Sequence, residues 1–347
     1  MRRLPIYFLV DVSESMVGAP IEEVQNGMRT IIQNLRTDPY ALETVFVSII
    51  AFAGKAKTLT PLTELFKFYP PTFPIGGGTS LGKGLECLMD DMDRNVQKTT
   101  MEQKGDWKPI VFLFTDGNPT DDYSKAFRRW NEKYRRHCNL VAVSIGDNVN
   151  VLVLAQITDN ILLLKETDAE SFSQFFKWVT ASIKQTSVSV SEQAADEIKL
   201  APTSGINLEK VDLRERQAPA ATTDDNYAVL HAKCQNTKQE YLIKYSRKGH
   251  PEAFGGMGEY RLVGAYPIDG ETYASLSAGP GQQINTMRLT GVPACPCCGN
   301  QLGAVVCECG RLMCVGDRNG GKCPWCGLEG TLGEGAAGGM NIGRGLG

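Results

Sequence analysis

The first 187 residues of the chain alternate between short apolar runs and longer segments in which apolar residues recur every three or four positions. The runs are rich in β-branched and aromatic residues, which predicts buried strands at 4–10, 43–52, 109–114, 139–146 and 161–164. The intervening segments predict helices. Strands and helices that alternate in this way pack as a doubly wound, mostly parallel sheet with helices on both faces. We therefore predict a Rossmann-like α/β fold for residues 1–187.

Five oxygen-bearing side chains occupy loops of this predicted domain. They are Asp11, Ser13 and Ser15 after the first strand, Thr79 in the glycine-rich loop at 76–80, and Asp116 after the strand at 109–114. Ligands of open α/β sheets bind at the carboxyl ends of the strands, where such loops converge. Mg²⁺ prefers oxygen ligands and usually keeps several waters. The sequence predicts that these five residues form a magnesium site.

Two enzyme motifs overlap the glycine-rich loop. Residues 78–82 match the G-x-S-x-G pattern of hydrolases, but the proline-rich stretch at 70–75 stands where that motif requires a strand. Residues 77–83 match the G-x-x-x-x-G-K pattern of phosphate-binding loops, but Gly84 stands where a serine or threonine would hold Mg²⁺. Neither motif therefore indicates catalysis here.

A phosphatase with an aspartyl nucleophile after its first strand would need a second carboxylate two positions later. That position is Ser13, so transfer of a phosphoryl group through Asp11 is poorly supported. A Mg²⁺-dependent phosphohydrolase that uses Asp11 and Asp116 is the alternative to a non-catalytic metal site.

The eleven cysteines are unevenly distributed. Cys87, Cys138 and Cys234 are dispersed, and we interpret them as structural or surface residues, whereas the other eight fall between Cys295 and Cys326. This density is typical of metal binding and not of a disulfide framework spread over a secreted domain. A thiol oxidoreductase would instead need a single Cys-x-x-Cys motif at the start of a helix.

Two Cys-x-x-Cys-Gly knuckles flank a predicted hairpin near the carboxyl terminus. Their cysteines are Cys295 with Cys298 and Cys323 with Cys326. Four thiolates arranged as a tetrahedron are a structural Zn²⁺ site, and this layout predicts a zinc ribbon. Cys309 and Cys314 are candidates for further zinc ligands, and the pairing of the remaining cysteines stays open. Metal binding would supply much of the folding energy of so small a module.

Composition and patterning divide the rest of the chain. We predict an α/β domain at 1–187, a linker at 188–226, a small β-rich segment at 227–290, a cysteine-rich zinc module at 291–330 and a flexible glycine-rich tail at 331–347. A net charge of −3 provides no basic field for nucleic acid. No apolar run approaches the roughly 18 residues of a membrane span, and Asp11 interrupts the amino-terminal one. A cytoplasmic protein is expected.

The combination of Asp-x-Ser-x-Ser, Gly-Gly-Thr and Thr-Asp-Gly in this order resembles the von Willebrand factor A domain. All five motif positions match in residues 11–116. The resemblance implies a metal-ion-dependent adhesion site, in which an aspartate or glutamate of a partner protein completes the coordination of Mg²⁺. Followed by the cysteine cluster, the chain is similar to TerY-type proteins of tellurium-resistance and stress-response systems, which implies a protein kinase and a PP2C-like phosphatase as partners. The expected function is a non-enzymatic adaptor.

Overall fold

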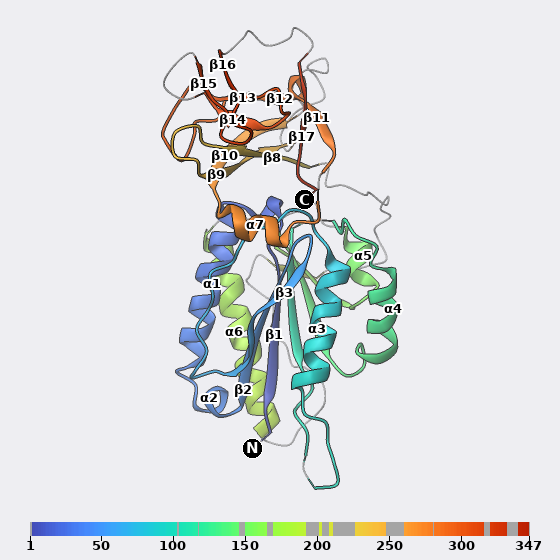
Figure 1. The fold of residues 1–347 in the computed structure, drawn as a ribbon. Coiled ribbons are helices and arrows are strands. Elements are labelled where there is room, and N and C mark those ends of the chain that lie inside the picture. The colour runs from blue at the N-terminus through green and yellow to red at the C-terminus, as the bar shows by residue number, and fades with distance from the viewer. Residues whose placement is uncertain are drawn as a thin grey trace.

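The structure is a computed structural model of the 347-residue chain. It describes residues 2–102, 104–116, 118–145, 150–164, 169–191, 201–202, 208–210, 226–247, 260–279, 281–315, 320–331 and 339–346. These residues form two domains, one α/β and one composed mostly of short strands (Figure 1).

A seven-stranded sheet forms the centre of the first domain, in the order β3-β2-β1-β4-β5-β6-β7. Its strands are β1 (Leu4–Asp11), β2 (Val45–Phe52), β3 (Ala56–Glu64), β4 (Ile110–Thr115), β5 (Asn139–Ile145), β6 (Asn160–Leu164) and β7 (Leu208–Lys210). The five inner strands run parallel, and the edge strands β3 and β7 are antiparallel to their neighbours. The predicted doubly wound, mostly parallel sheet is confirmed.

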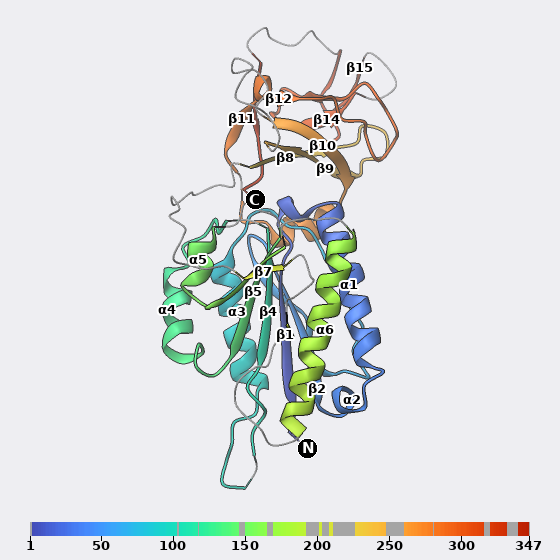
Figure 2. The same cartoon turned by 180° about the vertical axis from the view of Figure 1, so that it is seen from behind.

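Helices cover both faces of this sheet (Figures 1 and 2). One face carries α1 (Ala19–Leu35), α2 (Pro39–Thr44) and α6 (Ala169–Ser191), and the other carries α3 (Leu81–Asn95), α4 (Ser124–Lys133) and α5 (Val151–Ala155). Strand β1 contributes to both layers, because Ile6 and Phe8 pack in the core beneath α1 and α6 whereas Tyr7 and Leu9 pack in the core beneath α3 and α4. A strand buried on both faces appears in the sequence as a continuous apolar run.

The second domain contains a six-stranded sheet in the order β12-β10-β9-β8-β14-β13. Its strands are β8 (Tyr227–Lys233), β9 (Glu240–Ser246), β10 (Tyr260–Pro267), β12 (Leu289–Thr290), β13 (Ala304–Val306) and β14 (Leu312–Cys314). Two further ribbons pair β11 (Gln283–Asn285) with β17 (Asn341–Gly343) and β15 (Gly320–Lys322) with β16 (Glu329–Thr331). Helix α7 (Gly270–Leu276) and the short 3₁₀ helices η1 (Glu14–Met16) and η3 (Thr286–Arg288) complete the described elements.

The structure corrects several predicted boundaries. Strand β14 pairs with β8, so the segments at 227–290 and 291–330 share one sheet and one core and are not separate units. Part of the predicted linker forms β7, and part of the predicted flexible tail forms β17, where Ile342 is buried. These pairings join segments far apart in the chain, which local sequence patterns do not report. The remainder of the linker and tail lies largely outside the described residues.

The second domain lies on the end of the first domain where the parallel strands terminate, with α7 at the junction (Figures 1 and 2). This is the edge at which the five predicted magnesium ligands occur. Among the described helices, none is long and apolar enough to span a lipid bilayer.

Candidate functional site

Hydrogen bonds connect four of the five predicted magnesium ligands at the carboxyl edge of the sheet. The backbone N–H of Ser13 donates to Asp11 Oδ1 at 2.9 Å, and the hydroxyl oxygens of Ser13 and Ser15 lie 3.0 Å apart. Ser15 Oγ then donates to Asp116 Oδ1 at 2.7 Å. Thr115, the last residue of β4, donates its hydroxyl to Asp11 Oδ2 at 2.6 Å. The neighbouring strands β1 and β4 thus bring both carboxylates into one bonded network.

Thr79, the fifth residue, lies in the loop that leads into α3. Its backbone is fixed, because its N–H donates to Thr120 Oγ1 at 2.9 Å and its carbonyl accepts from the Thr120 N–H at 2.8 Å. Its side-chain oxygen Oγ1 is buried and has no hydrogen-bond partner within the described part of the chain. A buried hydroxyl without a partner costs about 1–3 kcal/mol. Such an atom at this edge indicates a place for a ligand.

The donor set fits a hard divalent cation. It offers two carboxylates and three hydroxyls, and the exposed fraction of these side chains is 0% for Asp11 and at most 5% for the others. Two carboxylates so close together and removed from water repel one another unless a cation or proton compensates them. A metal ion would neutralise them and would bond the otherwise unpartnered Thr79 hydroxyl. That these residues bind Mg²⁺ stays a prediction, and the geometry is consistent with it.

A segment of the second domain lies directly against the loops of this site. We name residues 276–278 the capping segment. Its hydrogen bonds run from the Lys55 N–H to the Leu276 carbonyl at 2.9 Å, from the Ala278 N–H to the Gly77 carbonyl at 3.1 Å and from the Gly77 N–H to Ser277 Oγ at 2.9 Å. A β-carbon at Gly54 would lie only 2.0 Å from the Ala278 nitrogen. The absence of side chains at the glycines around the site therefore lets the backbone of the second domain approach closely and also leaves room for a ligand.

Two buried polar contacts extend this cover over the loop that follows β1. Lys244 of β9, 4% exposed, donates Nζ to the backbone carbonyls of Ser15 and Val17. Tyr273 of α7 donates its hydroxyl to Glu14 Oε1, and Glu14 is 1% exposed. Burial and the Glu14 charge raise the pKa of Tyr273, so the phenol stays protonated and keeps donating. The second domain consequently shields the candidate magnesium site from solvent.

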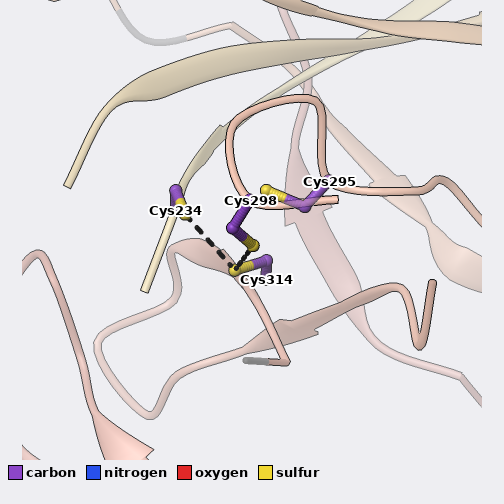
Figure 3. Close-up of side chains that lie close together, drawn as sticks. All are labelled: Cys234, Cys295, Cys298 and Cys314. Atoms are coloured by element: carbon purple, nitrogen blue, oxygen red, sulfur yellow. Dashed lines mark hydrogen bonds between the residues drawn. The ribbon is translucent and has the colours of Figure 1, made fainter. Parts of the chain in front are cut away.

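The second domain contains two groups of four cysteines, which we name the first and the second cysteine group. The first cysteine group consists of Cys234, Cys295, Cys298 and Cys314, whose sulfurs all lie within 4.8 Å of one another (Figure 3). Cys314 Sγ lies 3.9 Å from Cys298 Sγ and 3.8 Å from Cys234 Sγ. A tetrahedral Zn²⁺ with bonds of about 2.3 Å requires sulfurs about 3.8 Å apart. The spacing fits zinc.

The second cysteine group consists of Cys307, Cys309, Cys323 and Cys326. Cys307 Sγ lies 3.7 Å from Cys326 Sγ, and Cys309 Sγ lies 3.9 Å from Cys323 Sγ. Burial acts to raise the pKa of Cys323, but hydrogen bonds from the backbone N–H groups of Cys326 and Trp325 help to lower it to about 7. In the same group the backbone hydrogen bond from Cys309 acts to lower the pKa of Cys307, but burial and the neighbouring thiols raise it to about 12. Since thiolates are the metal-binding form, a bound cation would have to displace the Cys307 proton.

The predicted single site that unites the two knuckles is wrong in its pairing. Cys295 and Cys298 belong to one group, whereas Cys323 and Cys326 belong to the other. The predicted hairpin is present as β13 and β14. Cys307 and Cys309 lie in its turn, whereas Cys314 is the last residue of the three-residue strand β14. A three-residue strand spans about 7–10 Å, which is too far for one metal ion to bridge. The candidates Cys309 and Cys314 accordingly lie in different groups.

Cys234 was not among the predicted ligands, although its local structure repeats that of the knuckles. Its N–H donates to the carbonyl five residues later and its carbonyl accepts from the N–H four residues later, as at Cys295 and Cys323. Lys238 takes the positive-φ position, at 64°, that glycine takes in both knuckles. The second cysteine is replaced by Thr237, whose N–H contacts Cys234 Sγ at 3.4 Å. The Cys-x-x-Thr-Lys pattern before a strand was the available signal.

Comparison with known families divides the chain in the same place as the fold. Residues 6–178 match the von Willebrand factor type A domain, and residues 224–347 match the TerY-C metal binding domain. The second match covers the β-rich segment, both cysteine groups and the tail, which agrees with their common sheet.

Individual relatives match less than half of the chain. The inter-alpha-trypsin inhibitor heavy chain H1 of Sus scrofa is 22% identical over 162 residues, and that of Bos taurus is 23% identical over 118 residues. These matches cover 45% and 33% of this chain, which spans 18% and 13% of the length of the two relatives.

Two solved structures are similar to about half of the chain. The pilus adhesin SpaC of Lactobacillus rhamnosus GG has a TM-score of 0.43 and 13% identity over 54% of this chain and 30% of its own. Proximal thread matrix protein 1 from the mussel byssus, in a form with a zinc-occupied MIDAS motif, has a TM-score of 0.38 and 19% identity over 54% of this chain and 46% of its own. The two family matches follow one another in the same order as the two structural domains. Together they identify the chain as a TerY-like protein with a von Willebrand factor A domain and a TerY-C metal binding domain.

Proposed function

We propose that this protein is a non-enzymatic adaptor of a tellurium-resistance or stress-response system. In this proposal the first domain binds a partner protein through Mg²⁺ held by Asp11, Ser13, Ser15, Thr79 and Asp116. The observation that carries the proposal is the buried Thr79 hydroxyl, which has no hydrogen-bond partner among the described residues, at the same edge as two buried carboxylates. Because Mg²⁺ usually keeps several water ligands, a partner's aspartate or glutamate could replace one of these waters and complete the coordination.

The two cysteine groups would each hold one Zn²⁺ and would shape the second domain into a separate interaction surface. The TerY-C match supports metal binding by this domain, and the sulfur spacing supports zinc as the metal. A serine/threonine kinase and a PP2C-like phosphatase are the partner classes that we propose, in a cytoplasmic setting.

Access to the magnesium site would require the second domain to move. The capping segment, Lys244 and Tyr273 close the site through a small set of polar contacts. A cavity of about 640 Å³ lined by residues of both domains, including Glu14 and Tyr273, shows that they are not tightly packed against one another. The contact also includes a small apolar cluster of Val17, Val229 and Leu242. Relative motion between domains is expected unless their interface is large and hydrophobic. We therefore propose that a partner carboxylate binds the ion only in an open arrangement.

Replacing Thr79 with valine should weaken Mg²⁺ binding by roughly tenfold or more, because it removes one ligand oxygen while keeping the shape of the side chain. Calorimetric titration of the full chain with MgCl₂ measures the change, and Thr79→Ser, which keeps a hydroxyl, should bind nearly as well as the wild type. The same valine variant should lose its partners in pull-downs from lysate. Equal Mg²⁺ affinity in all three proteins would show that Thr79 is not a ligand.

The double variant Tyr273→Phe/Lys244→Met should open the site, because it deletes two contacts that hold the cover closed. With Mn²⁺ as the probe, water-proton relaxation per bound ion should rise several-fold, since fast water exchange at the ion needs access to solvent. Tyr245→Phe/Lys238→Met, which makes the same chemical changes away from the interface, should match the wild type. If the water-proton relaxation per bound Mn²⁺ in the wild type is already as high as in the Tyr273→Phe/Lys244→Met variant, the site is not closed.

A further inference from the structure

A cavity of about 800 Å³ lies at the end of the first domain opposite the magnesium site. Its walls include Arg2, which precedes β1, and Pro109, which precedes β4, so it is located at the amino ends of the parallel strands. The last turns of α3 and α4 and the segments at 96–99 and 106–109 complete it. Pockets of 300–1,000 Å³ are typical of small-ligand sites.

The cavity is strongly basic although the whole chain carries a net charge of −3. Its cationic side chains are Arg2, Lys98, Lys108, Lys133 and Arg136. Within the described part of the chain, none of these five forms an ion pair. Gathering five such cations around one hollow is electrostatically unfavourable, and a bound anion would relieve the repulsion.

The two carboxylates in the lining do not neutralise these cations, because each binds an arginine outside it. Asp106 accepts two hydrogen bonds from Arg3, at 2.8 and 2.6 Å. Asp93 accepts from Arg129 at 3.2 Å and from the Tyr134 hydroxyl at 2.6 Å. The positive charge of the lining is consequently available to a ligand.

One cation is already fixed in position. The Arg2 guanidinium lies 3.6 Å from the centre of the Trp107 ring and donates to the carbonyl oxygens of Gly105, at 2.8 Å, and Asp106, at 3.2 Å. A guanidinium held in this way loses little further freedom when it binds a phosphate or carboxylate. The Lys98, Lys133 and Arg136 side chains are exposed and can reach an anion from the rim.

We propose that this basic cavity binds a small phosphate-bearing anion with several negative charges, such as an inorganic polyphosphate or a nucleoside triphosphate. Five cations match the charge of a triphosphate, and the volume admits one. The competing explanation is that Lys133 and Arg136 only compensate the dipole at the carboxyl end of α4. That explanation does not account for Arg2, Lys98 and Lys108, which lie outside this helix.

The test is calorimetric titration of the full chain with tripolyphosphate and, separately, with ATP, in buffer without Mg²⁺ so that the magnesium site cannot hold phosphate. Both ligands should bind the wild type. Lys133→Gln/Arg136→Gln should weaken binding at least about tenfold, because it removes two of the five positive charges that would contact the phosphates. If ATP binds more tightly than tripolyphosphate, the cavity also contacts the nucleoside. If the two bind equally, the cavity recognises the phosphates alone.

The matched control is Lys125→Gln/Arg128→Gln. It removes the same two charges from exposed positions of the same helix, outside the cavity. Its affinity should stay within about twofold of the wild type. The inference is overturned if neither ligand binds the wild type, or if both variants lose affinity equally, which would indicate attraction by overall charge. A lower melting temperature of Lys133→Gln/Arg136→Gln with unchanged affinity would support the helix-dipole role instead.

Discussion

Replacing Cys234 with serine is expected to reduce the zinc content from two ions per chain to one and to unfold much of the second domain. Cys234, Cys295 and Cys314 are buried in the same core as Tyr241, Tyr245 and the other apolar residues of this domain. A structural Zn²⁺ contributes about 10–16 kcal/mol of apparent folding free energy in small modules, more than so small a core can replace. Elemental analysis gives the zinc content, and circular dichroism during heating reports the loss of structure.

Cys297 provides a matched control for this prediction. It is adjacent to Cys298 but belongs to neither cysteine group, so Cys297→Ser should retain two zinc ions and the wild-type melting temperature. Full zinc content in Cys234→Ser would contradict the first cysteine group as a metal site.

Replacing Asp11 with asparagine is expected to lower Mg²⁺ affinity by roughly two orders of magnitude or more, because it removes one of the two charged ligands and keeps a single amide oxygen, which can accept from Ser13 or from Thr115 but not from both as the carboxylate does. Titration with MgCl₂ measures the loss. Asp91→Asn is the control, since Asp91 is also a buried carboxylate of this domain but lies in α3, outside the candidate site.

The same Asp11 variant distinguishes the adaptor from the alternative phosphohydrolase. Purified wild-type protein should show no turnover of phosphoesters in the presence of Mg²⁺. Turnover that Asp11→Asn abolishes and Asp91→Asn preserves would contradict the non-enzymatic function. Unchanged Mg²⁺ affinity in Asp11→Asn would place the ion elsewhere.

The sequence predicted the first domain well because its elements are specified locally. The run at 4–10 is apolar throughout except for the hydroxyl of Tyr7, and this identifies a strand covered on both faces whatever its partners are. The chain order of strands and helices then restricts the topology to a parallel sheet, and the motif loops follow at its carboxyl edge. The closeness of Asp11, Ser15 and Asp116 was therefore predictable before any distance was measured.

The second domain was less predictable because its organisation depends on contacts between distant segments. Cys234 joins a metal group with Cys314, 80 residues later, and the pairing of β8 with β14 that permits this involves only two residue pairs. A three-residue strand carries no periodicity that could reveal its partner. The cover over the candidate magnesium site is equally remote from local patterns, because Tyr273 and Glu14 are 259 residues apart.

The capping segment has a thermodynamic consequence for any partner of the first domain. Because it belongs to the same chain, it would compete with the proposed partner at a fixed effective concentration that dilution cannot reduce. The apparent dissociation constant equals the intrinsic one divided by the fraction of molecules that are open, so an open fraction of about 1% would weaken binding about a hundredfold. A ligand or modification that favours the open arrangement would strengthen partner binding without touching the metal. Selectivity would then reside at the metal, and affinity would be adjustable from the second domain.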